Sequence, residues 1–276
     1  MPIVTTPDHV AIAVPDIDAA AVRWRDGFGG AWLMPAMPSE EAGFASRQLR
    51  FHGGAKLELL EPLGPESFAG RFLARFGATI HHVTLKVPDL LPAVEMVRAA
   101  GYDVVDISTY GDIWHEGFLR PSQVGGMIVQ LAWSGQTDEE WIALSGVEPE
   151  EPAPAGAALL GPTLRHPDLD AAARLWTTLG ATVTREVSHD GDTSPDADGA
   201  ADADGTADSD ASRDADGAAD ADGAGDRATA LDVAWPSAPL TVRIELGDVA
   251  GPVGLRFRGA APIDAHPTFG PATLSG

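Results

Sequence analysis

The chain has 276 residues, of which 44% are hydrophobic, so it can form one large domain or two modest domains with a substantial core. Its 18 basic and 41 acidic residues give a formal net charge of −23, and such a surface repels nucleic acid and anionic membranes. The absence of cysteine excludes disulfides, thiolate metal sites and cysteine nucleophiles.

Composition also bears on the environment of the protein. Lys56 and Lys86 are the only lysines, and a balance rich in aspartate and poor in lysine is typical of salt-accumulating halophiles. A GC-rich genome also replaces lysine by arginine, so that origin stays an alternative. The first residues lack the basic and then apolar layout of a signal peptide, and no run of about 18 apolar residues occurs. We therefore expect a cytoplasmic protein.

The first predicted elements form a βαβββ unit. Residues 9–14 alternate as a half-buried strand does. A Pro-Asp pair at 15–16 begins a turn, and Asp18 is a candidate N-cap for the helix that follows. Three more strands are predicted at 30–34, 45–51 and 56–61, the last two separated by a Gly-Gly turn.

This unit is repeated along the chain. Residues 8–24 match residues 81–97 at a constant offset of 73, and residues 161–176 form a third copy with Gly161 in place of the first histidine. The module ends repeat as well, at an offset of 72, which sets Glu58 opposite Gln130. The positions shared by the first two copies are His9 and His82, Val10 and Val83, Val14 and Val87, Pro15 and Pro88, Asp16 and Asp89, and Ala20 and Ala93.

The repeats predict an α+β protein in which paired βαβββ modules form a curved, open-barrel sheet, followed by a degenerate third module. We expect the paired domain at 1–134, a linker rich in Pro and Glu at 146–156, the third module at 157–259 and a tail at 260–276.

An insert at 190–226 interrupts the third module. It contains 13 Asp, 11 Ala and 6 Gly and has no apolar periodicity, so we expect disorder. Its Asp-x-Asp-Gly pattern does not predict a calcium loop, because the third acidic position and the distal Glu of an EF-hand are absent.

Two modules side by side direct four polar side chains to one concave face. The first strands supply the imidazoles of His9 and His82, and the last strands supply Glu58 and Gln130. Two His and one carboxylate suit a divalent transition metal (Co, Mn, Ni, Zn or Fe), and the neutral amide completes a cage with room for water or substrate. His81 is predicted on the opposite face of its strand, as a structural or surface residue.

The remaining candidates are assigned to structure rather than chemistry. The third module keeps Glu245, aligned with Glu58, but has no imidazole, so we expect it to hold no metal and either to pack on the first domain or to mediate a homodimer. Six aromatic side chains are predicted to lie in the core rather than in a pocket: Trp24, Phe44, Phe51, Phe72, Phe76 and Trp133.

Three stretches in order resemble one known family. They are DHVAIAVPDIDAA, then LELLEPLGPESFAGRFLARFG with IHHVTLKVPDL directly after it, and FLRPSQVGGMIVQL. The sequence resembles the vicinal oxygen chelate (glyoxalase, bleomycin resistance and dioxygenase) superfamily, most closely its methylmalonyl-CoA epimerase-like branch, over about residues 5–134. The resemblance implies that His9 and His82 are the two His ligands of the metal.

The chain departs from the branch at two places. The epimerases usually have Gln at the position of Glu58 and Glu at that of Gln130, so the pair is exchanged here. Ser46 stands where the branch carries a catalytic Glu that is not a metal ligand. If proton abstraction survives, the candidate bases are Glu58, His115 and Glu116, and only one of the last two adjacent strand residues can point inward.

We therefore expect a metal-dependent isomerase or epimerase that removes a proton next to a chelated carbonyl of a small-molecule substrate such as an acyl-CoA. Two alternatives stay open. One is an Fe(II) dioxygenase of the same superfamily. The other is a non-catalytic protein that binds a small ligand in the same cavity. Neither nucleic acid nor membrane is an expected partner.

Overall fold

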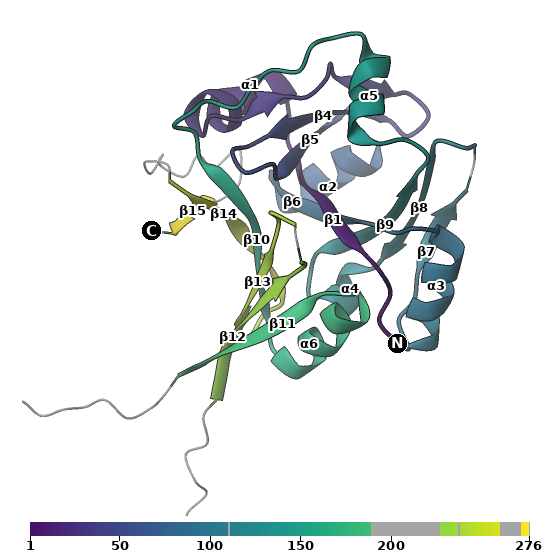
Figure 1. Cartoon of the computed structure of the whole chain (residues 1–276), viewed down its shortest axis with the longest axis vertical. Coiled ribbons are helices and arrows are strands. Elements are labelled where there is room, and N and C mark those ends of the chain that lie inside the picture. The colour runs from purple at the N-terminus through teal and green to yellow at the C-terminus, as the bar shows by residue number, and fades with distance from the viewer. Residues whose placement is uncertain (110, 189–226, 237, 260–271, 276) are drawn as a thin grey trace, which may run out of the picture.

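The computed structural model describes residues 1–109, 111–188, 227–236, 238–259 and 272–275. The expected α+β class is confirmed: the described chain forms a nine-stranded sheet from β1 to β9 and a six-stranded sheet from β10 to β15. In Figure 1 the first sheet fills the upper and right part of the molecule and the second lies at the lower left. None of the helices described has the length and apolarity that a membrane span requires.

Three βαβββ modules share one strand order. In each, the first strand pairs in parallel with the last, and the last pairs antiparallel with the strand before it. The first strands of the first two modules pair antiparallel with each other and join these modules into one sheet. The elements of the first sheet are β1 (Thr6–Ala13), α1 (Ile17–Ala21), the π-helical turn η1 (Val22–Gly27), β2 (Ala31–Trp32), β3 (Met37–Ser39), β4 (Phe44–Arg50), β5 (Lys56–Pro62), α2 (Phe68–Phe76), β6 (Thr79–Lys86), α3 (Leu90–Ala99), β7 (Val105–Ser108), β8 (Trp114–Leu119), α4 (Pro121–Val124), β9 (Ile128–Ser134) and α5 (Asp138–Ser145).

The third module repeats this arrangement and is followed by the start of a fourth. Its first strand pairs antiparallel with β14, as the first strands of modules one and two pair with each other. The strand β15 lies in the segment 260–276 that was expected to be a tail. The elements are β10 (Ala158–His166), α6 (Leu169–Thr178), β11 (Thr182–Ser188), β12 (Arg227–Ala234), β13 (Val242–Leu246), β14 (Gly251–Arg258) and β15 (Ala272–Ser275).

The insert 190–226, predicted to be disordered, lies outside the described residues, between β11 and β12. The proposed linker at 146–156 contains no helix or strand, and all of it is described. Glu150 fixes this segment to the first module, because its carboxylate accepts hydrogen bonds from Arg25 Nη2 at 2.8 Å and from the backbone N–H of Trp32 at 3.2 Å. The division into domains at these boundaries stays a prediction.

The repeated Pro-Asp pair has a structural role in all three modules. Asp16, Asp89 and Asp168 are the N-caps of α1, α3 and α6, and each side chain accepts a hydrogen bond from a backbone N–H in the first turn. The prediction that Asp18 caps the first helix is wrong, because Asp16 has the extended backbone that a cap requires. Asp18 instead lies in the first turn, where a carboxylate favours the helix dipole.

Alternation along the central strands separates an apolar face from a polar face. On β1, Val10 and Ile12 belong to the buried core, whereas His9 lies on the other, concave face. The core side carries α1, α3 and the third module, because buried residues of these helices and of both sheets form one hydrophobic cluster. Phe257 of β14 packs its ring against those of Trp24, Phe28 and Phe51.

Gly161 shows why the third module cannot have a histidine at this position. It has a φ of +122°, and a Cβ atom there would collide with the carbonyl oxygen of Thr241. The first strand of this module therefore passes too close to its neighbour to hold any side chain where the first module has His9.

We expect Gly161→Ala to lower the free energy of unfolding by about 3 kcal/mol, since backbone strain and a collision add up. Gly54→Ala is the matched control, because Gly54 also has a positive φ, of +94°, but no heavy atom within 4 Å of its added Cβ. It should cost only about 1 kcal/mol. Urea unfolding measures both, and equal losses would contradict the assigned collision.

Candidate active site

A cavity of about 1210 Å³ covers the concave face of the first sheet. All four residues predicted as metal ligands line it: His9, Glu58, His82 and Gln130. The strands that supply them are neighbours, since β5, β1, β6 and β9 follow one another in the sheet. The duplication thus brings together side chains that are up to 121 positions apart in the sequence.

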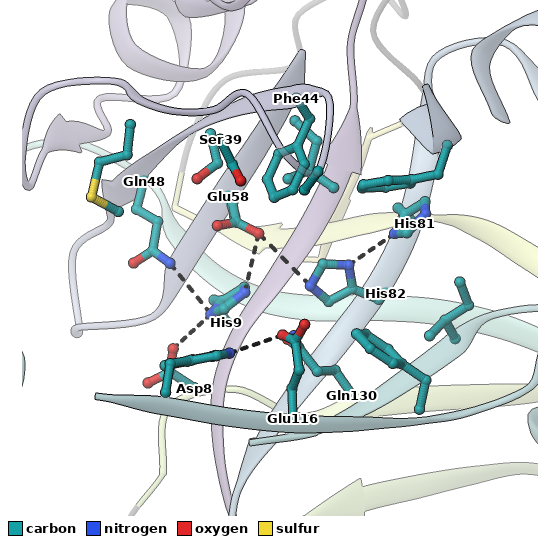
Figure 2. Close-up of a pocket in the computed structure, with 18 of the residues that line it drawn as sticks. Asp8, His9, Ser39, Phe44, Gln48, Glu58, His81, His82, Glu116 and Gln130 are labelled. Carbon is teal, nitrogen blue, oxygen red and sulfur yellow. Dashed lines mark hydrogen bonds and ion pairs between the residues drawn. The ribbon is translucent and has the colours of Figure 1, made fainter. Parts of the chain in front are cut away.

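Three of these residues form a tight cluster around the Glu58 carboxylate. Glu58 Oε2 lies 3.3 Å from His9 Nε2 and 3.7 Å from His82 Nε2. The nearest ligand atoms of the three residues all lie within 4.8 Å of one another, which is a spacing that one metal ion can bridge. Figure 2 shows Glu58 facing both imidazoles from the same side.

Two β-bulges place a second residue beside each histidine. The pairing of β1 with β6 skips Asp8 and His81. Each directly precedes one of the two histidines of the cluster, and the two are 73 positions apart. A bulge turns its extra side chain out of the regular alternation. Asp8 Oδ2 lies 2.6 Å from His9 Nδ1, and His81 Nδ1 lies 2.9 Å from His82 Nδ1. The predicted outward position of His81 is therefore wrong: it is buried and lines the cavity.

The two bulge residues fix which nitrogen of each ring faces the cavity. Because Nδ1 of His9 bonds to Asp8 and Nδ1 of His82 bonds to His81, both Nε2 atoms point toward Glu58. Nε2 of His82 is buried and has no hydrogen-bond partner among the described residues. In the tautomer in which Nδ1 of His82 donates to His81, Nε2 presents the lone pair that a metal ligand needs.

The two histidines differ in charge. Burial opposes protonation of His9, but Glu58 and Asp8 outweigh it and raise the pKa of His9 to about 9. Burial, together with repulsion from His81 and His9, holds the pKa of His82 well below 6.5. Burial also opposes ionisation of Glu58, yet the His9 charge and hydrogen bonds from Gln48 and Ser46 lower the pKa of its carboxyl. The metal-free site thus contains an imidazolium, a carboxylate and a neutral imidazole.

Ser46, which stands in place of the family's Glu, therefore has a supporting role here. It is buried, lines the cavity and hydrogen-bonds to Glu58. A hydroxyl cannot act as a carboxylate base, but it stabilises the neighbouring carboxylate in its ionised form.

Gln130 is connected to His9 and to Glu116 by a chain of hydrogen bonds. Thr84 Oγ1 donates to Gln130 Oε1 at 2.5 Å and lies 3.0 Å from His9 Nε2. Gln130 Nε2 donates to Glu116 Oε2 at 2.7 Å, and that oxygen also accepts from Trp114 Nε1 at 2.9 Å. The amide of Gln130 is therefore engaged at both ends.

Of the two adjacent candidates on β8, Glu116 lines the cavity and His115 does not. His115 Nε2 donates to the Gly111 carbonyl at 2.7 Å, and its ring lies against that of Trp133 at 4.6 Å between centroids. In Figure 2, Glu116 and Glu58 lie on opposite sides of the two imidazoles.

Several lining residues were not predicted from the sequence. Phe44, Phe72 and Phe76 line the cavity, so their assignment to the core is wrong, whereas Trp24 and Phe51 are fully buried as predicted. Phe72 and Phe76 belong to α2, which borders the cavity between the two modules. Further lining residues are Phe68, Arg71 and Arg75 on α2, Arg120 after β8, and Trp141 and Ile142 on α5.

Comparison with known proteins agrees with this architecture. Residues 8–117 match the model of the Glyoxalase/Bleomycin resistance protein/Dioxygenase superfamily. The ethylmalonyl-CoA/methylmalonyl-CoA epimerase of Cereibacter sphaeroides is 35% identical over 130 residues, which cover 45% of this chain and 94% of that protein. The mitochondrial methylmalonyl-CoA epimerase of Homo sapiens is 34% identical over 130 residues, which cover 45% of this chain and 71% of the relative.

A solved structure, that of methylmalonyl-CoA epimerase from Mycobacterium tuberculosis, aligns with 49% of this chain and 92% of its own, at 26% identity and a TM-score of 0.45. The matched model and the paired modules define a protein of the vicinal oxygen chelate superfamily, as the sequence motifs predicted. Within it, the chain belongs to the methylmalonyl-CoA epimerase-like branch.

We expect His9 to titrate near pH 9 in the metal-free protein, as measured by NMR of its imidazole. Because the folded-state pKa is raised, the stability that His9 contributes is fully present below pH 6.5 and is lost as the pH rises through about 9. Glu58→Gln removes the main attraction and should lower the pKa of His9. A wild-type His9 that titrates at or below 6.5 would contradict this assignment.

Proposed function

We propose that the chain is a metal-dependent epimerase that removes and returns the α-proton of a 2-substituted acyl-CoA. The observation that carries this proposal is the buried cluster of His9, Glu58 and His82 at a large cavity, with a second carboxylate, Glu116, on the other side of the imidazoles. A similar epimerase function is supported by the named activities of the relatives.

The residues fit a divalent transition metal. Two imidazole nitrogens and one carboxylate are donors that such ions prefer, and the buried Nε2 of His82 has no other described partner. His9, Glu58 and His82 would hold the ion, with Gln130 as a neutral fourth donor after its oxygen leaves Thr84. When bound, the ion supplies Lewis-acid chemistry that makes the α-proton more acidic. Co, Mn, Ni, Zn and Fe remain candidates.

Glu116 is our choice for the base. Glu58 is an unfavourable base, because His9, Gln48 and Ser46 stabilise its ionised form. Both hydrogen bonds of the Glu116 carboxylate, to Trp114 and to Gln130, use Oε2, which leaves Oε1 without a hydrogen-bond partner among the described residues of a side chain that lines the cavity. Oε1 would take the α-proton as the C–H electron pair moves toward the thioester carbonyl. A solvent proton that is delivered to the opposite face, as the enolate electron pair returns to the α-carbon, inverts the carbon.

The cavity suits a thioester with a long anionic carrier. Its mouth contains the exposed side chains of Phe76 and Met37. The exposed side chains of Arg71 and Arg75 line it from α2, the helix that also carries Phe76. On a chain with a net charge of −23, a pair of cations at the cavity mouth favours phosphate groups. The pantetheine arm would pass along the aromatic side chains of α2, and the acyl group would reach the histidines.

Solvent exchange tests the reaction. With methylmalonyl-CoA in deuterium oxide, the wild-type protein loaded with cobalt should incorporate deuterium at the α-carbon. Glu116→Gln should slow this by about 10²–10⁴-fold with little change in KM, since it removes the base but keeps the hydrogen-bond geometry. His115→Gln, on the neighbouring residue outside the cavity, is the control and should stay within about twofold. Exchange that survives in Glu116→Gln would reject this residue as the base.

Two further measurements, read together with α-exchange, separate the rival functions. Oxygen consumption with an Fe(II)-loaded protein would favour a dioxygenase. Tight binding of acyl-CoA esters without any α-exchange would favour a non-catalytic binding protein and would reject the epimerase.

Metal binding has its own test, by titration with cobalt(II). Asp8→Asn should weaken binding by about 10–100-fold, because the charged partner of His9 Nδ1 is lost. Asp89→Asn, at the N-cap of α3 and outside the lining of the cavity, should leave the affinity unchanged, and His82→Ala should abolish binding. Equal affinities in wild type and His82→Ala would remove the metal from the proposal.

A further inference from the structure

The only two lysines of the chain both line the cavity. The other 16 basic residues are arginines, of which Arg71, Arg75 and Arg120 also line the cavity. Lysine differs from arginine in presenting a compact point charge. A chain that otherwise uses arginine thus places both of its ammonium groups beside the candidate active site, and the two groups are held in different ways.

Lys56 is fully engaged by protein carboxylates. Its ammonium donates to Asp8 Oδ1 at 2.9 Å and to Asp138 Oδ2 at 2.6 Å. Asp8 in turn bonds to His9. Lys56 is therefore part of the framework that holds the first histidine, and it has little capacity to bind a ligand.

Lys86 has no such partner. Its Nζ atom lies over the ring of Trp114, 4.2 Å from the centroid, and forms no ion pair with any described carboxylate. Asp8 and Asp138, the acidic groups that influence its charge, are both bound by Lys56. Lys86 is half-buried, so its charge is partly removed from water without a fixed counter-ion.

The position of Lys86 on its strand directs it along the site. His82, Thr84 and Lys86 alternate on the concave face of β6 and all three are cavity-facing or in contact with cavity ligands. Lys86 follows Thr84 by two residues, which is about 7 Å along a strand. Thr84 itself contacts His9, so Lys86 lines the cavity on the face that carries the histidines, two strand positions beyond Thr84.

We propose that Lys86 is a specificity-determining residue that binds the free carboxylate of a malonyl-type half-thioester. This inference rests on the proposed function, because it assigns the acyl end of the same cavity. The substrate carboxylate supplies the counter-ion that the protein lacks, and an acyl-CoA without a second carboxylate leaves the ammonium unpaired. Trp114 supports the ammonium through its ring while its N–H orients Glu116, so one indole places both the anchor and the base.

The test compares two esters that differ only in the carboxylate, malonyl-CoA and propionyl-CoA, by isothermal titration calorimetry with the purified full chain. Wild type should prefer malonyl-CoA, and Lys86→Met should reduce that preference by about tenfold or more, because a charged hydrogen-bonded contact is lost. Lys86→Arg keeps the charge and should retain part of the preference. Arg174→Met removes a positive charge from the exposed face of α6 and should leave the preference unchanged.

Three results would overturn the assignment. One is an unchanged preference in Lys86→Met, and another is an equal loss of affinity for both esters, which would indicate packing alone. The third is a variant that keeps the preference but loses α-exchange, because Lys86 would then act in proton transfer. If Lys86→Met does not fold, the preference measured with Lys86→Arg decides: a partly reduced preference supports the assignment, and an unchanged preference contradicts it. Absence of α-exchange in wild type, together with a preference for malonyl-CoA that Lys86→Met removes, would reject the proposed epimerase and retain only the contact between Lys86 and the ester carboxylate.

Discussion

The site depends on one electrostatic balance, in which the carboxylate of Glu58 is kept ionised at the inner face of a sheet. Removing a carboxylate from water is costly unless charges and hydrogen-bond donors replace the solvent. Here the second charge comes from His9, and Ser46 and Gln48 add hydrogen bonds. The same contacts protonate His9, so Glu58 and His9 sustain each other. A bound cation would take over the role of the imidazolium proton, which is why a set of metal ligands can be stable without metal.

The duplication made much of this site predictable. His9, His82 and Glu58 follow from equal positions in repeated strands. Side chains alternate between the two faces of a strand, and β5, β1 and β6 are neighbours, so equivalent residues of both modules lie on the same concave face. Residue spacing could not predict the bulges at Asp8 and His81, since regular alternation assigns them to the wrong face. A signal was present nonetheless: in both repeats a polar, hydrogen-bonding residue directly precedes the ligand histidine.

The placement of the aromatic residues failed for a different reason. Phe44, Phe72 and Phe76 are apolar residues of the kind that forms a core, but all three line the cavity: Phe44 from β4, and Phe72 and Phe76 from α2, which borders the concave side of the sheet. A hydrophobic pattern indicates that a face is covered, and it does not distinguish cover by protein from cover by a ligand. The choice between His115 and Glu116 likewise needed the register of β8 against β9, which no local pattern contains.

Asp138 connects the segment after the second module to the chemistry of the first. It belongs to α5, beyond the part of the chain that the family model matches, yet its carboxylate holds Lys56, which holds Asp8, which holds His9. A chain shortened to the paired modules would keep every ligand and still lose one of the two anions around Lys56. The ammonium would then draw more strongly on Asp8, so the unit that sets the charge of His9 extends past the last strand of its sheet to include the helix that follows.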